Sequence, residues 1–356
     1  MARVAGVSVA TVSRALRGLD RVSPQTREKV LRVAEDLHYV ASPTATSLAS
    51  GRTRVVAVVA PFLTRWFFAT LVSAIEKSLR AQGHHVILFD LEDETYDQRL
   101  TLTQNMLWKR VDGIIMLNVP MTDEEVDLVE RLGLPLVTIG SPVPGRACVR
   151  IDDRLAMRTA VEHLAGLGHT RIGYIGSVPA NVAHIQTPQD RLEAFKECVV
   201  EFGLTCAPEW ILNSDWTAEA AARDSTSLLT SEHRPTAIVA ASDEMAIGVR
   251  ESARRLGMAV PGDLSIIGID DYLLSGVLGL TTVRQDVAGQ GHAAAELLLR
   301  ALLHDDTILP TPPRIETGNH LRLSLHDISV PQPGMVHPGA EHIDRVAADG
   351  TQLDVA

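Results

Sequence analysis

Apolar runs and amphipathic stretches alternate along most of the chain. Seven apolar runs predict strands, at 55–60, 86–90, 113–117, 135–139, 172–176, 237–241 and 265–269. Helical spacing of apolar residues predicts helices around 68–82, 97–110, 123–132, 154–167, 188–202, 217–231, 243–256 and 287–304. Near-continuous apolar strands separated by helices indicate parallel sheets covered on both faces. So many strand–helix units divide more naturally into two doubly wound lobes than into one, and the expected fold class is α/β.

The first 40 residues follow a different pattern, that of short helices. Ser8 can cap a helix that begins at Val9, and Ser23 can cap a second helix with Pro24 in its first position. The first of these helices is entered through a tight turn at Gly6. Two short capped helices joined in this way predict a helix-turn-helix DNA-binding headpiece. An ordinary capped helix pair in an α-helical domain is the alternative.

Two further segments have little apolar pattern. In residues 41–54, Ser42, Pro43 and Gly51 could begin and end a short helix, which on its own is marginal in water. A flexible linker is the other interpretation of this segment. Residues 327–356 combine several prolines and glycines with no apolar period, which predicts a disordered tail. The expected domains are a headpiece at 1–40, a hinge helix or linker at 41–54, a two-lobed region at 55–326 and the tail at 327–356.

The net charge of −11 averages two unlike parts of the chain. Residues 1–54 carry nine Lys and Arg against four Asp and Glu, a net charge of +5. The remaining residues carry 24 basic and 40 acidic side chains, a net charge of −16. A basic amino-terminal module on an acidic body is expected when that module alone meets nucleic acid.

Cysteine usage and hydropathy favour an intracellular protein. Cys148, Cys198 and Cys206 are odd in number and have no metal-ligand spacing, so we interpret them as reduced thiols. No signal peptide is recognisable, and no apolar run approaches the roughly 18 residues of a membrane span. We expect a cytoplasmic protein without a membrane partner.

Motifs between residue 2 and about residue 325 occur in the order known from one regulator family. They are Ala5-Gly6-Val7-Ser8, Thr11-Val12-Ser13-Arg14, Val22-Ser23-Pro24-Gln25-Thr26-Arg27, Tyr39, Gly51-Arg52-Thr53, Gly168-His169, Ser242-Asp243-Glu244-Met245-Ala246-Ile247-Gly248, Gly268-Ile269-Asp270-Asp271 and Leu280-Thr281-Thr282-Val283-Arg284-Gln285. Together they resemble the lactose/galactose repressor (LacI/GalR) family.

The resemblance implies double-stranded operator DNA as a partner. In this family the two headpieces of a dimer read the halves of a near-palindrome, and a hinge-helix leucine wedges into the minor groove. We expect DNA contacts from Ser8, Val9, Ala10, Thr11, Ser13, Arg14, Arg17, Thr26, Ala45 and Leu48. No carboxyl-terminal leucine heptad is visible, so a homodimer is expected rather than a tetramer.

The resemblance also implies a periplasmic-binding-protein-like region that holds a small-molecule effector between two lobes. We expect a sugar or sugar derivative, bound at the carboxyl ends of the strands. In the family's motif the equivalent of Arg191 donates two parallel hydrogen bonds to vicinal oxygens, and Asp270 can accept from two hydroxyls. The expected effector-binding residues are Phe67, Phe68, Arg191, Trp216, Ser242 and Asp270. A surface arginine, a core tryptophan and helix-packing phenylalanines are the alternatives, and Asp243 is expected to cap the helix behind it.

The chain departs from the family pattern at several places. Arg65-Trp66 stands where Asn-Pro is common, and Ala41-Ser42 stands where Pro-Asn precedes the hinge helix. A cationic Arg65 at the mouth of the cleft would suit an acidic sugar or a carboxylate. Family headpieces also carry a longer first helix, so we expect a native start about ten residues upstream of Met1.

Nothing in the sequence assembles a catalytic site. No Gly-x-Gly-x-x-Gly follows the first predicted strand, and no phosphate-binding glycine-rich loop ends in Lys-Ser or Lys-Thr. We therefore expect no enzyme activity and no cofactor. The predicted function is a DNA-binding transcriptional regulator, a repressor, under allosteric control by an effector. The alternative is a solute-binding or ligand-sensing module that does not recognise an operator.

Overall fold

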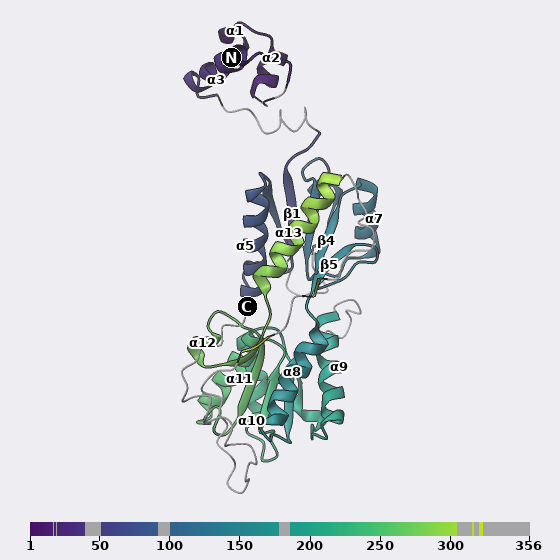
Figure 1. Cartoon of the computed structure of the whole chain (residues 1–356). Helices are drawn as coiled ribbons and strands as arrows, with labels where there is room; N and C mark the ends of the chain where they lie inside the picture. Colours follow the sequence, from purple (N-terminus) through teal and green to yellow (C-terminus); the bar gives the residue numbers. More distant parts are fainter. Residues whose placement is uncertain are drawn as a thin grey trace.

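A small helical headpiece and two α/β lobes follow one another along the molecule (Figure 1). The computed structural model describes residues 1–16, 18, 20–39, 51–91, 100–177, 186–304, 315–316 and 320–322. The headpiece lies at one end, the first lobe in the middle and the second lobe at the other end. The expected α/β fold class with an amino-terminal headpiece is confirmed.

The headpiece consists of α1 (Ala2–Ala5), α2 (Val9–Leu16) and α3 (Pro24–Asp36). Both expected caps are present: the Thr11 N–H donates to Ser8 Oγ at 3.1 Å, and the Thr26 N–H donates to Ser23 Oγ at 3.2 Å. Each hydroxyl satisfies one of the free N–H groups of a first helical turn. Four buried apolar side chains, Ala5, Val12, Ala15 and Val30, hold the helices together.

The first lobe is a six-stranded sheet with the order β11-β5-β4-β3-β1-β2, all parallel. Its strands are β1 (Val55–Ala60), β2 (His85–Asp90), β3 (Gly113–Leu117), β4 (Leu136–Ile139), β5 (Ala147–Arg150) and β11 (Ile315–Glu316). Its helices are α5 (Trp66–Ala81), α6 (Gln104–Leu107), α7 (Asp123–Leu132) and α13 (Val287–His304). α5 and α13 share an apolar cluster with one face of the sheet, and α6 and α7 share another with the opposite face.

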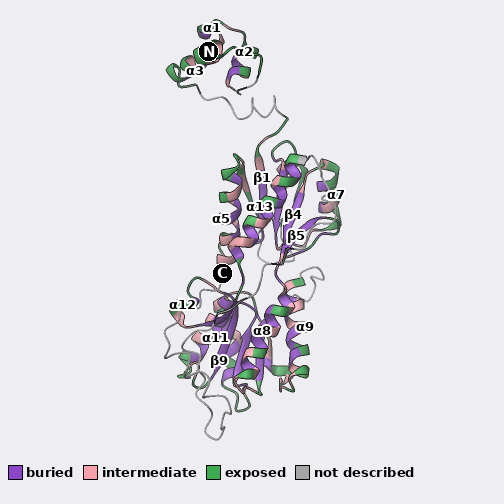
Figure 2. Cartoon of the chain, viewed as in Figure 1, coloured by how far each residue is buried: buried purple, intermediate pink, exposed green. Residues whose placement is uncertain are grey.

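The second lobe repeats this plan with the order β12-β10-β9-β8-β6-β7, in which β12 alone of the paired strands is antiparallel to its neighbour. Its strands are β6 (Ile172–Gly176), β7 (Ile211–Asn213), β8 (Ala237–Ala240), β9 (Ser265–Asp270), β10 (Thr281–Arg284) and β12 (His320–Arg322). Its helices are α8 (Asp153–Gly166), α9 (Gln186–Glu201), α10 (Ala218–Leu229), α11 (Asp243–Arg255) and α12 (Ser275–Leu278), with a 3₁₀ turn at Pro208–Trp210. The central strands of both sheets are buried between helices (Figure 2).

The chain passes between the lobes more than once. It leaves the first lobe between β5 and α8, and it returns between β10 and α13. Arg150, the last residue of β5, donates to Gln186 Oε1 at 2.6 Å, and Gln186 is the first residue of α9 in the other lobe. The carboxyl end of the first sheet therefore meets the second lobe, as the expected two-lobed architecture requires.

The seven predicted strands are present, with bounds within one residue of those expected. The short strands β5, β7, β10, β11 and β12 were not predicted, because each has a charged, amide or histidine side chain among only two to four residues, which interrupts the apolar run. The helix expected at 97–110 is wrong in its described part, where α6 spans four residues. The Leu102 N–H donates to Glu125 Oε1 at 2.8 Å and the Leu100 N–H to the Leu91 carbonyl at 3.3 Å, so these groups are used outside a helix.

We predict opposite effects of alanine at two helical glycines. At Gly248 in α11 a Cβ would lie 2.2 Å from the Ala218 carbonyl oxygen of α10, so Gly248→Ala should lower the free energy of unfolding by about 1–3 kcal/mol. At Gly166 in α8 a Cβ would meet nothing within 4 Å, so Gly166→Ala should raise it by about 0.5–1 kcal/mol. Urea denaturation measures both, and equal effects would contradict the close helix crossing.

Candidate functional site

The outward face of α2 carries small side chains and one arginine. Ser8, Val9, Ala10 and Arg14 are exposed, with Val9 76% exposed, whereas Val12 on the opposite side is buried. Thr11 and Ser13 are half-buried. A helix face with small side chains can enter the major groove of DNA. There a guanidinium can donate hydrogen bonds to base edges, and a methyl group can contact a thymine methyl.

The other expected DNA contacts divide into two groups. Thr26 is half-buried in the first turn of α3, and its hydroxyl lies 2.8 Å from Ser23 Oγ. Arg17, Ala45 and Leu48 lie outside the described residues. The structure thus describes seven of the ten residues expected to contact DNA.

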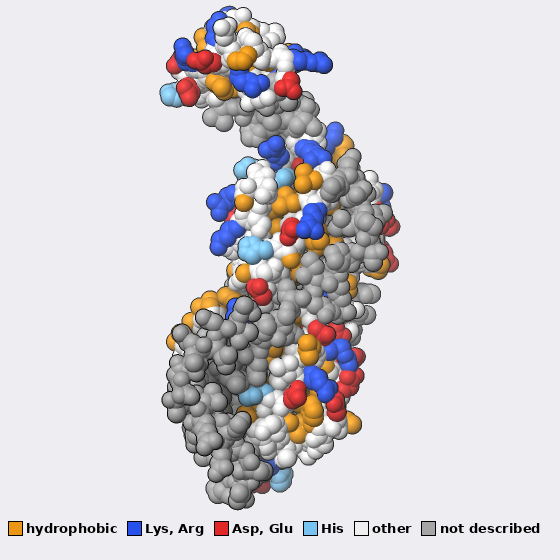
Figure 3. All heavy atoms as spheres, in the orientation of Figure 1, with side chains coloured by type: hydrophobic (Ala, Val, Ile, Leu, Met, Phe, Trp, Pro, Cys, Tyr) orange, Lys and Arg blue, Asp and Glu red, His pale blue; other side chains and the backbone are white. Residues whose placement is uncertain are grey.

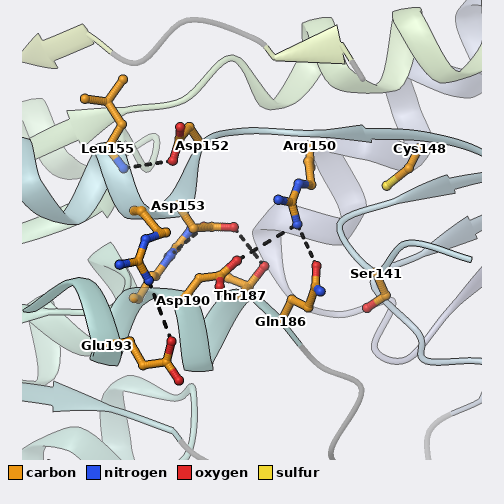
Figure 4. A network of polar contacts seen from close by, with 12 residues as sticks. Ser141, Cys148, Arg150, Asp152, Asp153, Leu155, Gln186, Thr187, Asp190 and Glu193 are labelled. Atoms are coloured by element: carbon orange, nitrogen blue, oxygen red, sulfur yellow. Dashed lines mark hydrogen bonds and ion pairs between the residues drawn. The ribbon is translucent and has the colours of Figure 1, made fainter. Parts of the chain in front are cut away.

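Arg191 forms a buried ion pair at the interface of α8 and α9. Its Nε and Nη2 both lie 2.8 Å from Asp153 Oδ1, and its Nη1 donates to the Ala241 carbonyl. Thr187 donates to Asp153 Oδ2 at 3.1 Å, so the carboxylate is held from two sides (Figure 4). Burial opposes the charge on Arg191, but the carboxylates of Asp153 and Asp270 outweigh it and raise the pKa of Arg191.

Asp270 ends β9 and is buried close to Arg191. The Gln285 side-chain amide donates to Asp270 Oδ1, and Gln290 of α13 donates to Gln285 Oε1 at 3.0 Å. The pKa of Asp270 is raised to about 8, chiefly by burial; the Arg191 charge opposes this rise and the neighbouring Asp243 adds to it. The Asp270 carboxyl is therefore held largely neutral at pH 7.

The backbone at Asp270 is also unusual. Asp270 has a φ of 140° and Asp271 a φ of 58°, both positive at residues that are not glycine. Such conformations are costly and persist when the surroundings determine them, and they concentrate at ligand sites. The turn after β9 is therefore an independent indication that this strand end is functional.

Ser242 has the capping role that was expected of Asp243. Ser242 Oγ, rather than the Asp243 carboxylate, caps α11 by accepting from the Met245 N–H at 3.3 Å. The expected cap at Asp243 is wrong. Its carboxylate instead accepts from the Tyr272 N–H at 2.8 Å and from the Ser275 and Thr282 hydroxyls at 2.7 Å. Asp243 thus fixes the turn that follows Asp270, and burial raises the pKa of this carboxyl as well.

The expected aromatic residues lie in different surroundings. Phe68 is buried in the apolar cluster of the first lobe, and the Phe67 ring packs edge-on against it with centroids 5.3 Å apart. Trp216 is half-buried against the apolar cluster of the second lobe. Packing therefore accounts for Phe68, whereas Phe67 and Trp216 keep part of their surface accessible.

A group of four residues bridges the lobes, and we call it the mouth latch: Arg65 and Trp66 of the first lobe, Glu244 and Tyr272 of the second. The Trp66 and Tyr272 rings meet edge to face, with centroids 5.2 Å apart. Burial raises the pKa of Glu244, against the opposing effects of the Arg65 charge and a hydrogen bond from the Trp66 N–H. The Arg65 guanidinium also lies over the Phe62 ring, 4.1 Å from its centroid. Arg65 is thus engaged within the protein.

A polar cavity of about 530 Å³ lies on the α8–α9 side of the Arg191 pair. It shares Asp153 with the Arg191 cluster, but Asp270 and Trp216 do not line it. Its arginines are matched by carboxylates. Arg150 lies 3.9 Å from Asp190 (Figure 4), and Arg154 lies 3.6 Å from Glu193. We place the candidate effector site at the Arg191–Asp270 cluster because that cluster combines buried, pKa-shifted groups at strand ends.

Sequence reasoning missed two residues of this cluster. Asp153 partners Arg191, and the Asp152-Asp153 pair after an apolar run was the available signal, but β5 itself had not been predicted. Gln285 follows β10, which was also not predicted. Recognising β5 would have placed Asp153 after the carboxyl end of a strand, and recognising β10 would have done the same for Gln285.

Comparison with known proteins agrees with this geometry. The family model for "Bacterial regulatory proteins, lacI family" matches residues 1–42, and the model for "Periplasmic binding protein-like domain" matches residues 161–324. Catabolite control protein A of Priestia megaterium is 35% identical over 327 residues, covering 89% of this chain and 96% of the relative. The chain belongs to the LacI family of bacterial regulatory proteins. It is therefore a DNA-binding transcriptional regulator with an effector-binding region.

Other LacI-family proteins are similar over nearly the same length. The HTH-type transcriptional repressor CytR of Escherichia coli K12 is 31% identical, covering 83% of this chain and 86% of the relative. A solved lac repressor dimer bound to operator and the anti-inducer ONPF has the same fold, with a TM-score of 0.78, 24% identity and coverage of 92% and 98%. These relatives are regulators rather than enzymes.

Neither a membrane span nor a metal site is found among the described residues. No helix among them is long and apolar enough to cross a bilayer. No group of three His, Cys, Asp or Glu side chains in the same part of the chain is arranged to hold a metal ion.

We predict that the titration of Asp270 makes stability depend on pH. Its pKa of about 8 in the folded chain exceeds the value near 4 of an unfolded aspartate, so stabilisation present below about pH 4 is lost as the pH rises through 8. The free energy of unfolding of the Asp270→Asn variant should therefore fall less between pH 5 and pH 9, by about 1 kcal/mol or more. Urea denaturation at both pH values measures this.

The exposed Asp127→Asn variant is the matched control and should keep the wild-type pH dependence. If Asp270→Asn lost as much stability as the wild type over this range, Asp270 would not be the group that titrates.

Proposed function

We propose that this regulator is a cytoplasmic homodimeric repressor whose effector is a neutral, sugar-like molecule bound between the lobes. The observation that carries this proposal is the buried Arg191–Asp153–Asp270 cluster at the carboxyl ends of strands. The proposed domains keep the boundaries expected from the sequence, with the headpiece at 1–40, the hinge at 41–54 and the two-lobed region at 55–326. Phe67, Trp216, Arg191 and Asp270 are the proposed effector contacts, with Ser242 and Phe68 shaping the site.

The charges in the cluster favour a neutral effector. Asp153 already neutralises Arg191, and burial keeps Asp270 largely protonated at pH 7. A protonated carboxyl can both donate to and accept from a hydroxyl, which suits a polyol. Arg65, the cation that favoured an acidic sugar, is engaged with Glu244 and the Phe62 ring. A regulator named CelR, solved as a complex with cellobiose, resembles this chain at 26% identity and a TM-score of 0.67 over 91% of its length.

The effector is proposed to act by changing how the lobes meet. It would bind second-lobe residues such as Arg191 and Asp270 while facing Phe67 of the first lobe. The mouth latch and the Arg150–Gln186 hydrogen bond are among the interlobe contacts that such binding would strengthen or break. A rotation of the first lobes in the dimer would then separate or join the two hinge segments, which include Ala45 and Leu48. DNA affinity and effector affinity are coupled reciprocally.

A homodimer is supported by an exposed apolar surface on the second lobe. Leu273 and Val277, beside and within α12, are 62% and 82% exposed. Figure 3 shows hydrophobic side chains gathered over this region. Exposed apolar side chains that lie together are typical of protein–protein interfaces. We propose that a second copy of the chain covers these side chains. The dimer would place its two headpieces on two half-sites, with DNA contacts from Ser8, Val9, Ala10, Thr11, Ser13, Arg14, Arg17 and Thr26.

We predict that DNA binding and effector binding can be lost separately. Arg14→Ala should weaken operator binding about tenfold or more, because an exposed guanidinium on the reading face is removed, and it should leave effector binding unchanged. Arg191→Ala combined with Asp153→Ala should abolish effector binding without leaving a buried unpaired charge, and should leave operator binding intact. Gel shift and calorimetry measure the two activities. Loss of both activities in both variants would contradict a modular arrangement.

We predict that the effector belongs to the neutral sugars. In a thermal-shift screen, cellobiose, ribose or a related neutral sugar should raise the unfolding temperature, because a ligand of the folded state stabilises it. Glucuronate and other acidic sugars should have no effect, since the cluster has no unmatched cation to offer them. Stabilisation by acidic sugars alone would refute the neutral-effector proposal and restore Arg65 as a ligand.

A further inference from the structure

The chain enters the first lobe through a turn that one carboxylate holds. Asp112 Oδ1 accepts from the Thr53 N–H at 2.7 Å and from the Thr53 hydroxyl at 2.8 Å. Asp112 Oδ2 accepts from the Arg54 N–H at 2.7 Å. Both carboxylate oxygens are therefore used to hold two successive residues of the segment that joins the headpiece to β1. We call Asp112, Thr53 and Arg54 the linker bracket.

The position of Asp112 in the sheet explains why its side chain reaches this turn. Asp112 directly precedes β3, whose Gly113 lies beside Val56 of β1. The Asp112 N–H donates to the Val55 carbonyl at 2.7 Å, which continues the pairing of β1 with β3 by one step. Beyond that step the Asp112 carboxylate replaces the backbone as the acceptor, so the bracket extends the sheet into the linker.

The conformation of the turn is suited to a carboxylate. Arg54 has a φ of 55° and Gly51 a φ of 72°, so the backbone turns on both sides of Thr53. Successive N–H groups in such a turn point to one side and form a concave site for an anion. The Val55 N–H donates to Thr53 Oγ1 at 3.1 Å and closes the turn. The bracket therefore fixes the direction in which the chain leaves the lobe.

We propose that Asp112 is a positioning residue for operator binding, because it holds Thr53 and Arg54 as a rigid extension of the first lobe. The proposal rests on the homodimeric repressor proposed above. With the bracket in place, a rotation of the lobe displaces the start of the linker by a defined amount. Without it, residues 51–54 gain conformational freedom, which absorbs the rotation and leaves the spacing of the two headpieces undefined.

The positioning role of Asp112 and the effect of its charge on DNA binding have opposite signs, so an experiment can separate them. Lys and Arg side chains lie around the entry of the chain into the first lobe (Figure 3). Removing the Asp112 charge makes this region more positive, which on its own should strengthen binding to polyanionic DNA. A loss of operator affinity in Asp112→Asn would therefore report the lost geometry and not the lost charge.

The experiment measures how strongly the DNA affinity of the full-length protein depends on the spacing between the half-sites. A duplex is selected from a random-sequence library by the wild-type protein, and versions with one or two base pairs inserted at its centre are made. Affinities are compared for wild type, Asp112→Asn, Asp112→Ala, Thr53→Val and Thr53→Ser, with Asp127→Asn as the control for an exposed acid of the same lobe. Thermal unfolding of each variant is recorded alongside.

We expect wild type, Thr53→Ser and Asp127→Asn to discriminate against the inserted duplexes by about tenfold or more, because their headpieces are held at a fixed separation. The Asp112 variants should discriminate by about twofold or less, with weaker binding to the selected duplex. Thr53→Val keeps the shape of threonine but removes the hydroxyl from the bracket, so it should lie between these limits.

Unchanged discrimination in Asp112→Asn and Asp112→Ala would overturn the proposal while leaving the repressor intact. Should these variants unfold, the Thr53 pair decides, since equal discrimination by Thr53→Val and Thr53→Ser would also overturn it. A selection that returned single half-sites would overturn both the homodimer and the bracket.

Discussion

The neutralisation of Arg191 inside the second lobe is the interaction on which the candidate site depends. A buried guanidinium without a partner would cost several kcal/mol, and removing one member of such a pair typically costs about 3–5 kcal/mol. Asp153 supplies the countercharge from α8, and the Ala241 carbonyl at the end of β8 accepts a further hydrogen bond. Two elements far apart in sequence are therefore fixed to α9 by one side chain, and the site is as rigid as the packing of the lobe.

This arrangement also determines what remains available to a ligand. The Arg191 charge lowers the pKa of Asp270, but burial raises that pKa by more and keeps the carboxyl largely protonated. Asp243 holds the strained turn after Asp270 through three hydrogen bonds, so that its own oxygens are used within the protein. The resulting surface offers hydrogen bonds without net charge. Gln285 and Gln290 carry the same network from β9 to α13 of the other lobe.

The sequence predicted the layers of this fold better than the contacts of its site. Apolar strands and capped helices depend on local pattern, so seven strands of the two sheets and the caps at Ser8 and Ser23 could be placed from the sequence alone. Asp153 and Gln285 could not, because they follow β5 and β10, in which an arginine among only four residues breaks up the apolar run. The roles of Ser242 and Asp243 depend on which neighbour each side chain reaches, which adjacent positions in a sequence do not distinguish.

The segment at 315–322 has a consequence for where the chain can be shortened. β11 lies along β5 in the first sheet, and β12 lies along β10 in the second. A truncation before Ile315 would strip one outer strand from each sheet and leave two rows of backbone N–H and C=O groups open to pairing with another molecule. The edges would then be the longer strands β5 and β10 in place of strands of two and three residues, and a longer open edge is a better template for aggregation.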